Sequence, residues 1–185
     1  CNAPESNVVS AAEHSVALLL ALARNVAQAH SALTQGRWER SLWTGSELLN
    51  KTVGIVGLGR VGRLVAQRLK GFDVRILAFD PFVSSESARA VNAEMVELDD
   101  LLSQSDFVTV HLPRTPETAG LFDAERFTKF KPGARLVNAA RGGVVIEDDL
   151  LEALESGHLG GAALDVFDTE PKVHSPLFTR EDVVV

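Results

Sequence analysis

The chain has 185 residues, a hydrophobic fraction of 45% and a charged fraction of 23%, values close to those of soluble globular proteins. This length suits one domain with a single hydrophobic core. The formal net charge of −7, without any run of Lys or Arg, argues against nucleic acids and anionic membrane surfaces as partners.

The composition and the ends of the sequence carry further expectations. Cys1 is the single cysteine, which excludes an internal disulfide and favours a reducing compartment, by default the cytoplasm. The longest apolar run, residues 16–23, is far shorter than the ~20 residues of a membrane span. Because the sequence opens on Cys1 instead of Met and stops in a strand-like apolar run, residues 183–185, we expect a fragment of a longer protein.

The first predicted element is a helix that begins at Ser10. Residues 10–13, Ser-Ala-Ala-Glu, match a capping box, in which the Ser10 hydroxyl and the Glu13 carboxylate each bond to the other residue's amide. The helical pattern continues to the stop signal at residues 35–36, Gln-Gly. Its central part is apolar on nearly every face, and such a helix has to be covered on all sides.

Two tryptophans, Trp38 and Trp43, follow this helix in a polar stretch. An exposed apolar patch of that size usually marks an interface. We therefore expect residues 1–50 to be a helical interdomain segment and residues 8–45 to join two copies of the chain as a two-fold homodimer. The alternative is that the helix is buried within one subunit.

From residue 51 onward, short β-rich runs alternate with helical patterns. Strands that alternate with helices and are apolar on both faces form a parallel sheet with right-handed crossovers. We therefore predict that residues 1–185 form a single α/β domain whose core, a doubly wound parallel sheet of the Rossmann type, covers residues 51–185. The six expected strands are 52–56, 74–79, 94–96, 107–110, 134–138 and 161–164.

Residues 57–62, Gly-Leu-Gly-Arg-Val-Gly, follow the first strand and open the next helix, which is the context in which this glycine pattern binds a dinucleotide. Gly57 permits the tight turn, Gly59 lets the backbone approach a pyrophosphate, and Gly62 lets helix and strand pack closely. The amides of Arg60 and Val61 would then face the phosphates. A glycine-rich turn without a ligand is the alternative.

Asp80 ends the second strand, near the ~20-residue offset at which an acidic side chain meets the adenosine ribose in such folds. Its carboxylate would accept hydrogen bonds from the ribose hydroxyls and repel a 2′-phosphate. Residues 81–83 contain no Arg or Lys to receive that phosphate, so the pattern predicts NAD in place of NADP. A simple turn role before Pro81 is the alternative.

Other candidate site residues lie just beyond later strands, where ligands bind in such sheets. Arg141 would hold a substrate carboxylate by a two-point contact. Asp165 would accept from the nicotinamide carboxamide, and Glu170 would orient a catalytic His. An ion pair for Arg141 and loop caps for the two acids remain open. Residues 111–113, His-Leu-Pro, also follow a strand, and Thr118 lies in the loop beyond them.

The five histidines give little indication of a catalytic or metal site. His111 more simply packs under a cofactor than acts as a base, and His174 is expected to be exposed and idle. His14, His30 and His158 have no recognisable partners in the sequence. No metal site is expected, because the single cysteine belongs to no His-Cys cluster.

Four ordered motifs, residues 56–62, 111–113, 138–143 and 164–171, resemble the signatures of the D-2-hydroxyacid dehydrogenases. The similarity extends from residues 2–4, Asn-Ala-Pro, to Val185. It implies hydride transfer between NAD and a small-molecule D-2-hydroxy acid. It implies Arg141 and Glu170 as catalytic residues. The residues expected to bind the cofactor, from the motifs and the resemblance together, are Gly57, Gly59, Arg60, Val61, Gly62, Asp80, His111, Leu112, Pro113, Thr118, Ala139, Ala140, Arg141 and Asp165.

The resemblance also implies what this chain lacks. In the family, a His follows Glu170 in a Pro-His step beyond the strand that residues 182–185 begin, and the substrate domain is formed by further segments. We therefore expect an NAD-binding domain that is inactive by itself. An NAD-sensing corepressor-like binding protein, or a family member with another substrate, would carry the same motifs.

Overall fold

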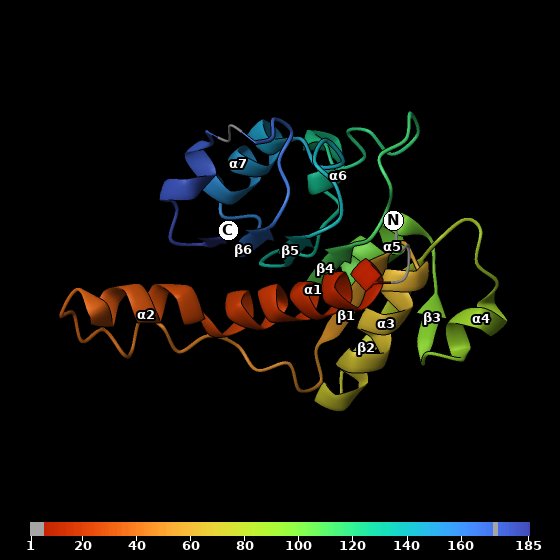
Figure 1. The fold of residues 1–185 in the computed structure, drawn as a ribbon, viewed down its shortest axis with the longest axis horizontal. Coiled ribbons are helices and arrows are strands. Elements are labelled where there is room, and N and C mark those ends of the chain that lie inside the picture. The colour runs from red at the N-terminus through yellow and green to blue at the C-terminus, as the bar shows by residue number, and fades with distance from the viewer. Residues whose placement is uncertain (1–5, 172–173) are drawn as a thin grey trace.

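Residues 6–171 and 174–185 are described by a computed structural model, at whose centre lies a sheet of seven parallel strands (Figure 1). The order β3-β2-β1-β4-β5-β6-β7 reverses between β1 and β4, as in doubly wound folds. The predicted Rossmann-type sheet is confirmed, and the six expected strands are correct to within one residue. The strands are β1 Thr52–Val56, β2 Arg75–Phe79, β3 Ala93–Met95, β4 Phe107–Val110, β5 Arg135–Asn138, β6 Gly161–Leu164 and β7 Val183–Val184.

Helices cover both faces of this sheet and enclose two apolar clusters. Leu19, Val65 and Ile55 belong to the cluster on one face, whereas Leu101 and Leu150 belong to the other. Burial of each such side chain contributes about 1.5–3 kcal/mol. The helices are α1 Ser6–Arg24, α2 Val26–Thr34, α3 Arg60–Leu69, α4 Ser85–Arg89, α5 Leu98–Gln104, α6 Ala124–Phe127 and α7 Glu147–Glu155, with single 3₁₀ turns at Lys70–Phe72 and Pro176–Thr179.

The register of the strands determines where ligands can bind. Val56 at the end of β1 lies opposite Phe79 of β2 and Val110 of β4. Asn138 of β5 lies opposite Val110 and Leu164. The residues that follow these strands therefore line up along one edge of the sheet, where two crossovers diverge and leave a crevice.

The predicted start of the first helix is wrong. The helix already begins at Ser6, so Ser10 lies inside it and the amide of Glu13 is used in a regular helical bond. The single helix expected up to residue 34 is also interrupted, because Asn25 adopts a left-handed conformation with φ 52°. No single described helix is long and apolar enough to cross a membrane; α1 and α2 together pass on length and composition but are bent by 62°.

Most of the apolar surface of α1 is buried within its own subunit. Leu18, Leu19 and Leu22 are buried, whereas Val16 and Leu20 are partly buried. The alternative of a helix covered within one subunit is therefore correct for most of α1. In contrast, α2 extends past the sheet (Figure 1).

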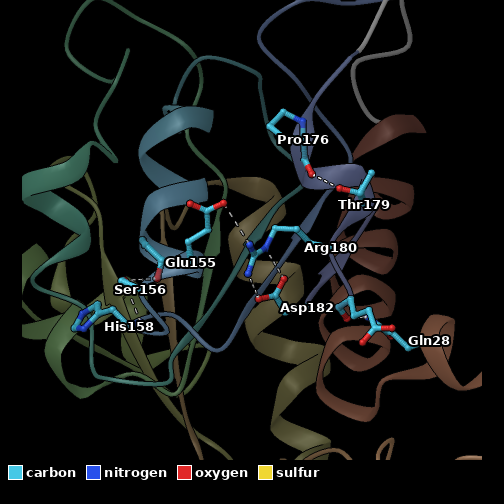
Figure 2. Close-up of polar contacts among 10 residues, drawn as sticks. Gln28, Glu155, Ser156, His158, Pro176, Thr179, Arg180 and Asp182 are labelled. Carbon is cyan, nitrogen blue, oxygen red and sulfur yellow. Dashed lines mark hydrogen bonds and ion pairs between the residues drawn. The ribbon is translucent and has the colours of Figure 1, made fainter.

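Polar contacts attach α2 and α7 to the segment that leads into the last strand (Figure 2). The Gln28 amide donates to the carbonyl of Glu181 at 2.8 Å. Arg180 makes two hydrogen bonds of 2.8 Å to Asp182 and lies 3.9 Å from Glu155 of α7. These contacts hold β7 at the edge of the sheet. Cys1 and the 2–4 motif lie outside the described residues.

Candidate functional site

A cleft of about 960 Å³ opens at the carboxyl ends of β1, β2 and β4. It lies at the point where the strand order reverses, which is the usual position of a ligand in such a sheet. Seven residues that sequence analysis singled out line it together: Gly57, Gly59, Asp80, His111, Leu112, Pro113 and Thr118.

The glycine-rich turn that follows β1 fits closely against its neighbours. Gly57 has φ 97°, and a Cβ there would come within 2.9 Å of the backbone of His111. A Cβ on the buried Gly62 would overlap the carbonyl oxygen of Gly57. Gly59 caps α3 without a side-chain hydrogen bond, so the helix presents uncapped amides at the cleft. This arrangement suits an anionic group such as a pyrophosphate.

Asp80 joins two parts of the cleft wall. Its Oδ2 accepts a hydrogen bond from the Leu58 amide at 2.8 Å, and its Oδ1 accepts from the Phe82 amide at 2.9 Å. The second bond is the local turn role that sequence analysis left open. A carboxylate has about four acceptor positions, so these two bonds leave capacity for ribose hydroxyls.

His111 lies at the base of the same cleft. Its Nε2 is 2.9 Å from the hydroxyl of the buried Thr109. Burial lowers the pKa of His111 to about 4, so the ring is neutral near pH 7 and accepts a proton poorly there. The environment favours packing beneath a ligand over service as a catalytic base.

Thr118 also lines the cleft, but its hydroxyl is used within its own loop. The hydroxyl donates to the carbonyl of Pro113 at 2.6 Å and accepts from the amide of Thr115 at 2.8 Å. The 113–118 loop is therefore held in shape by this side chain.

A second, smaller hollow of about 450 Å³ lies beyond β5 and β6 and contains both predicted catalytic residues. Arg141 is exposed and donates to the carbonyl of Ala140 at 2.6 Å. Glu170 accepts from the Phe167 amide at 2.9 Å, the loop-cap role that had been left open. Among the described residues, no histidine lines this hollow.

Asn138 holds the turn between the two sites. This side chain is only 2% exposed; its Oδ1 accepts from the Ala140 amide and its Nδ2 donates to the carbonyl of Arg141, both at 3.2 Å. Its own carbonyl accepts from the Asp165 amide at 3.0 Å. The ends of β5 and β6 are thereby joined next to the hollow.

The remaining candidates are distributed around these two sites. Gly62 is buried, which agrees with its expected packing role. Arg60 and Val61 begin α3 beside the glycine turn. Ala139 packs against the apolar cluster of α1 and α3, and Asp165 lies at the end of β6.

Sequence reasoning missed several pairings. Arg114 lies 3.6 Å from Asp168 in the second hollow. The two residues are far apart in the sequence, so no local pattern predicts this pair. Two histidines expected to be without partners have them. His14 Nε2 lies 3.2 Å from Asp165 Oδ1, and His158 Nε2 is 3.0 Å from the carbonyl of Phe130.

Known proteins with similar sequences point to the same kind of site. Residues 16–185 match the family model of the D-isomer specific 2-hydroxyacid dehydrogenase, NAD binding domain. The chain is 53% identical to a D-3-phosphoglycerate dehydrogenase of Mycobacterium tuberculosis (strain ATCC 25618 / H37Rv), over 100% of this chain and 35% of that protein. It is 46% identical to a D-3-phosphoglycerate dehydrogenase of Bacillus subtilis (strain 168), over 99% and 35% respectively.

Solved structures give the same result. An NAD-dependent formate dehydrogenase from Staphylococcus aureus in complex with NAD superposes with a TM-score of 0.90 at 41% identity, over 97% of this chain and 54% of that one. The apo D-lactate dehydrogenase from Escherichia coli gives 0.83 at 32% identity, over 88% and 51%. The chain spans about a third of the length of the curated relatives it matches. Both the predicted NAD cofactor and the predicted family are confirmed, and the chain belongs to the D-isomer specific 2-hydroxyacid dehydrogenases as their NAD-binding domain.

Proposed function

We propose that the whole protein oxidises D-3-phosphoglycerate with NAD, the first step of serine biosynthesis. The observation that carries the proposal is the position of the two sites, a nucleotide-sized cleft and the Arg141–Glu170 hollow, along one edge of one sheet. The substrate assignment rests on the relatives at 45–53% identity, which are named D-3-phosphoglycerate dehydrogenase. Another D-2-hydroxy acid is the alternative substrate.

The residues of the cleft fit a dinucleotide. In the proposed assignment, the turn at Gly57 and Gly59 and the first amides of α3, from Arg60 and Val61, hold the pyrophosphate. Asp80 accepts from the adenosine ribose and disfavours a 2′-phosphate. Leu112, Pro113 and Thr118 form the opposite wall, and Ala139, Ala140 and Asp165 lie toward the nicotinamide.

The second hollow supplies the groups for substrate. The bound nicotinamide accepts or donates the hydride; this chain's residues position the reactants. In the proposed assignment, Arg141 binds the carboxylate of the 2-hydroxy acid, where its planar fork matches two oxygens. Glu170 orients the proton-transferring His and stabilises its protonated form. The family resemblance places this His outside this sequence.

The test has two parts. The whole protein should reduce NAD with D-3-phosphoglycerate, and it should do so with a higher kcat/KM than with D-lactate or D-glycerate. This 185-residue chain alone should bind NADH in a fluorescence titration but should not oxidise NADH with phosphohydroxypyruvate. NAD-dependent capture of a protein partner without any turnover by the whole protein would favour a corepressor-like binding protein instead.

We also propose that two copies of the chain associate through residues 8–45, mainly through α2 and the segment 35–45 that follows it. The support for this proposal is that large apolar side chains of these residues are exposed. They are Val26, Leu33, Leu42 and Trp38, and Trp38 is 77% exposed. Such a patch favours a two-fold contact. Light scattering at micromolar concentration should give the mass of a dimer, and Trp38→Glu should give a monomer; a monomeric wild-type chain would contradict the proposal.

The single cysteine suits the cytoplasm, which we keep as the proposed location.

A further inference from the structure

His14 lies at the ligand edge of the sheet, although it belongs to the first helix of the chain. The α1 helix crosses β6 in the opposite direction to the strand. Leu22, near the carboxyl end of α1, is close to Gly161 at the start of β6, whereas His14 is close to Asp165 just beyond its end. The amino-terminal half of α1 therefore reaches the edge at which the nucleotide is proposed to bind.

The contact itself has a defined direction. His14 Nε2 lies 3.2 Å from Asp165 Oδ1. A carboxylate has no proton to donate, so this approach is favourable when Nε2 carries the proton. Both side chains are about half exposed, 49% and 52%, so a ligand can reach the second carboxylate oxygen.

Asp165 is fixed on its other side by the backbone. Its amide donates to the carbonyl of Asn138, and Asn138 in turn holds the turn of Ala140 and Arg141. The backbone of Asp165 is thus set by β5, whereas its carboxylate contacts a side chain from α1. Removal of His14 would leave the carboxylate free to rotate about its side-chain torsions.

We propose that His14 is a positioning residue for the nicotinamide end of the cofactor: it holds Oδ1 of Asp165 and thereby aims Oδ2 at the carboxamide N–H. This inference rests on the proposed role of Asp165. The competing explanation is an ordinary surface ion pair that only attaches α1 to the sheet, and such pairs contribute little to stability.

Two ligands separate these explanations, because ADP-ribose has the adenosine, pyrophosphate and second ribose of NADH but no nicotinamide. Titration calorimetry of this chain should show that His14→Leu weakens NADH binding roughly two- to tenfold, the range expected for one hydrogen-bonded group. Binding of ADP-ribose should not change. His14→Gln should restore most of the NADH affinity, because its amide nitrogen can occupy the place of Nε2. Leu and Gln have similar helix propensities, so α1 itself is a matched background.

A double-mutant cycle completes the test. If His14 acts through Asp165, His14→Leu should have no further effect on NADH binding in the Asp165→Asn variant. Equal weakening of NADH and ADP-ribose, or no change in either, would show a purely structural pair and overturn the inference alone. A wild-type chain that binds neither ligand would overturn the proposed function, and this inference with it.

Discussion

The nucleotide cleft and the Arg141–Glu170 hollow share one edge of the sheet but are built in different ways. The cleft is held together by hydrogen bonds of backbone groups. The Gly57 amide donates to the carbonyl of Phe79 at 2.8 Å, and the Asp80 carboxylate accepts from the Leu58 amide. In the hollow, the side chains of Arg141 and Glu170, which are predicted to be catalytic, are exposed and bond to atoms of their own loops. We therefore expect the cleft to be complete within this chain and the hollow to be completed only in the whole protein.

The largest effect should come from a change in the backbone packing of the cleft. In Gly62→Ala, the added methyl group overlaps the carbonyl of Gly57 and approaches Ile55. Because the obstacle is backbone, the strand and helix must separate, at a cost of about 3 kcal/mol in unfolding free energy. Urea denaturation should show this loss, and NADH binding should be lost with it.

Two matched glycines sharpen this prediction. A Cβ at Gly59 or Gly71 meets no atom within 4 Å. Gly59→Ala should leave the unfolding free energy within about 0.5 kcal/mol of wild type, yet weaken NADH binding because the methyl group would face the pyrophosphate. Gly71→Ala should change neither quantity. Equal stabilities of the Gly62 and Gly59 variants would show that the turn is less tightly packed than the structure indicates.

The next effect concerns the choice between NAD and NADP. The wild-type chain should bind NADH at least about a hundredfold more tightly than NADPH, because like charges brought together cost several kcal/mol. Asp80→Asn removes the charge and keeps one oxygen that can accept from the Leu58 amide, but its NH2 group then faces the Phe82 amide. The preference should therefore narrow to about tenfold or less, and the lost Phe82 hydrogen bond should lower the unfolding free energy by about 1 kcal/mol. Equal wild-type affinities for the two cofactors would refute the proposed role of Asp80.

The contrast between the two sites also explains what the sequence could predict. The sheet and the glycine turn depend on patterns within short windows, the alternation of apolar runs and the spacing of residues 57–62, and both were predicted correctly. The capping box at Ser10 has the same local character, yet the helix starts at Ser6. Tertiary packing of α1 on α3 and the sheet outweighs a cap contribution of about 1 kcal/mol.

Pairings between distant segments could not be predicted. His14 meets Asp165, and Arg114 meets Asp168, only because the fold brings separate elements to one edge. The same holds for the Leu58–Asp80 hydrogen bond, which joins two strand ends. No period or spacing within either segment encodes such contacts, whereas the residue types at the strand ends predicted residues that do line the cleft.

A smaller effect should appear in the pH dependence of stability. Burial lowers the pKa of His111 from 6.5 to about 4. The unfolded chain therefore takes up a proton before the folded chain does, and stability is lost as the pH falls from about 6.5 toward 4. Because the ring also faces the cleft, we expect a loss of about 1 kcal/mol between pH 7 and pH 5.

The variant His111→Gln isolates this contribution, because it cannot titrate. Denaturation at pH 7, 6 and 5 should give a steeper decline for wild type than for the variant. Asp106 does not interfere in this range. Burial alone would raise the pKa of Asp106, but Lys131 and the Thr52 amide lower it below 3.8, so its contribution is lost at more acidic pH. Parallel declines for the two proteins would show that His111 is solvated in the folded chain.

For this chain by itself, the smallest effect should come from the carboxylate of the second hollow. Glu170 Oε1 accepts from the Phe167 amide, and the Glu170 side chain does not line the nucleotide cleft. Glu170→Gln keeps an acceptor oxygen for that amide, so both the melting temperature and the NADH affinity of this chain should stay within error of wild type. Glu170→Ala removes the acceptor and should cost about 1 kcal/mol in stability, still without a change in NADH affinity.

In the whole protein, Glu170→Gln should lower kcat by about 10²-fold or more, because the proton-transferring His loses its charged partner. A weakened NADH affinity of the isolated chain in Glu170→Gln would break the division proposed here, since it would place Glu170 within the nucleotide site.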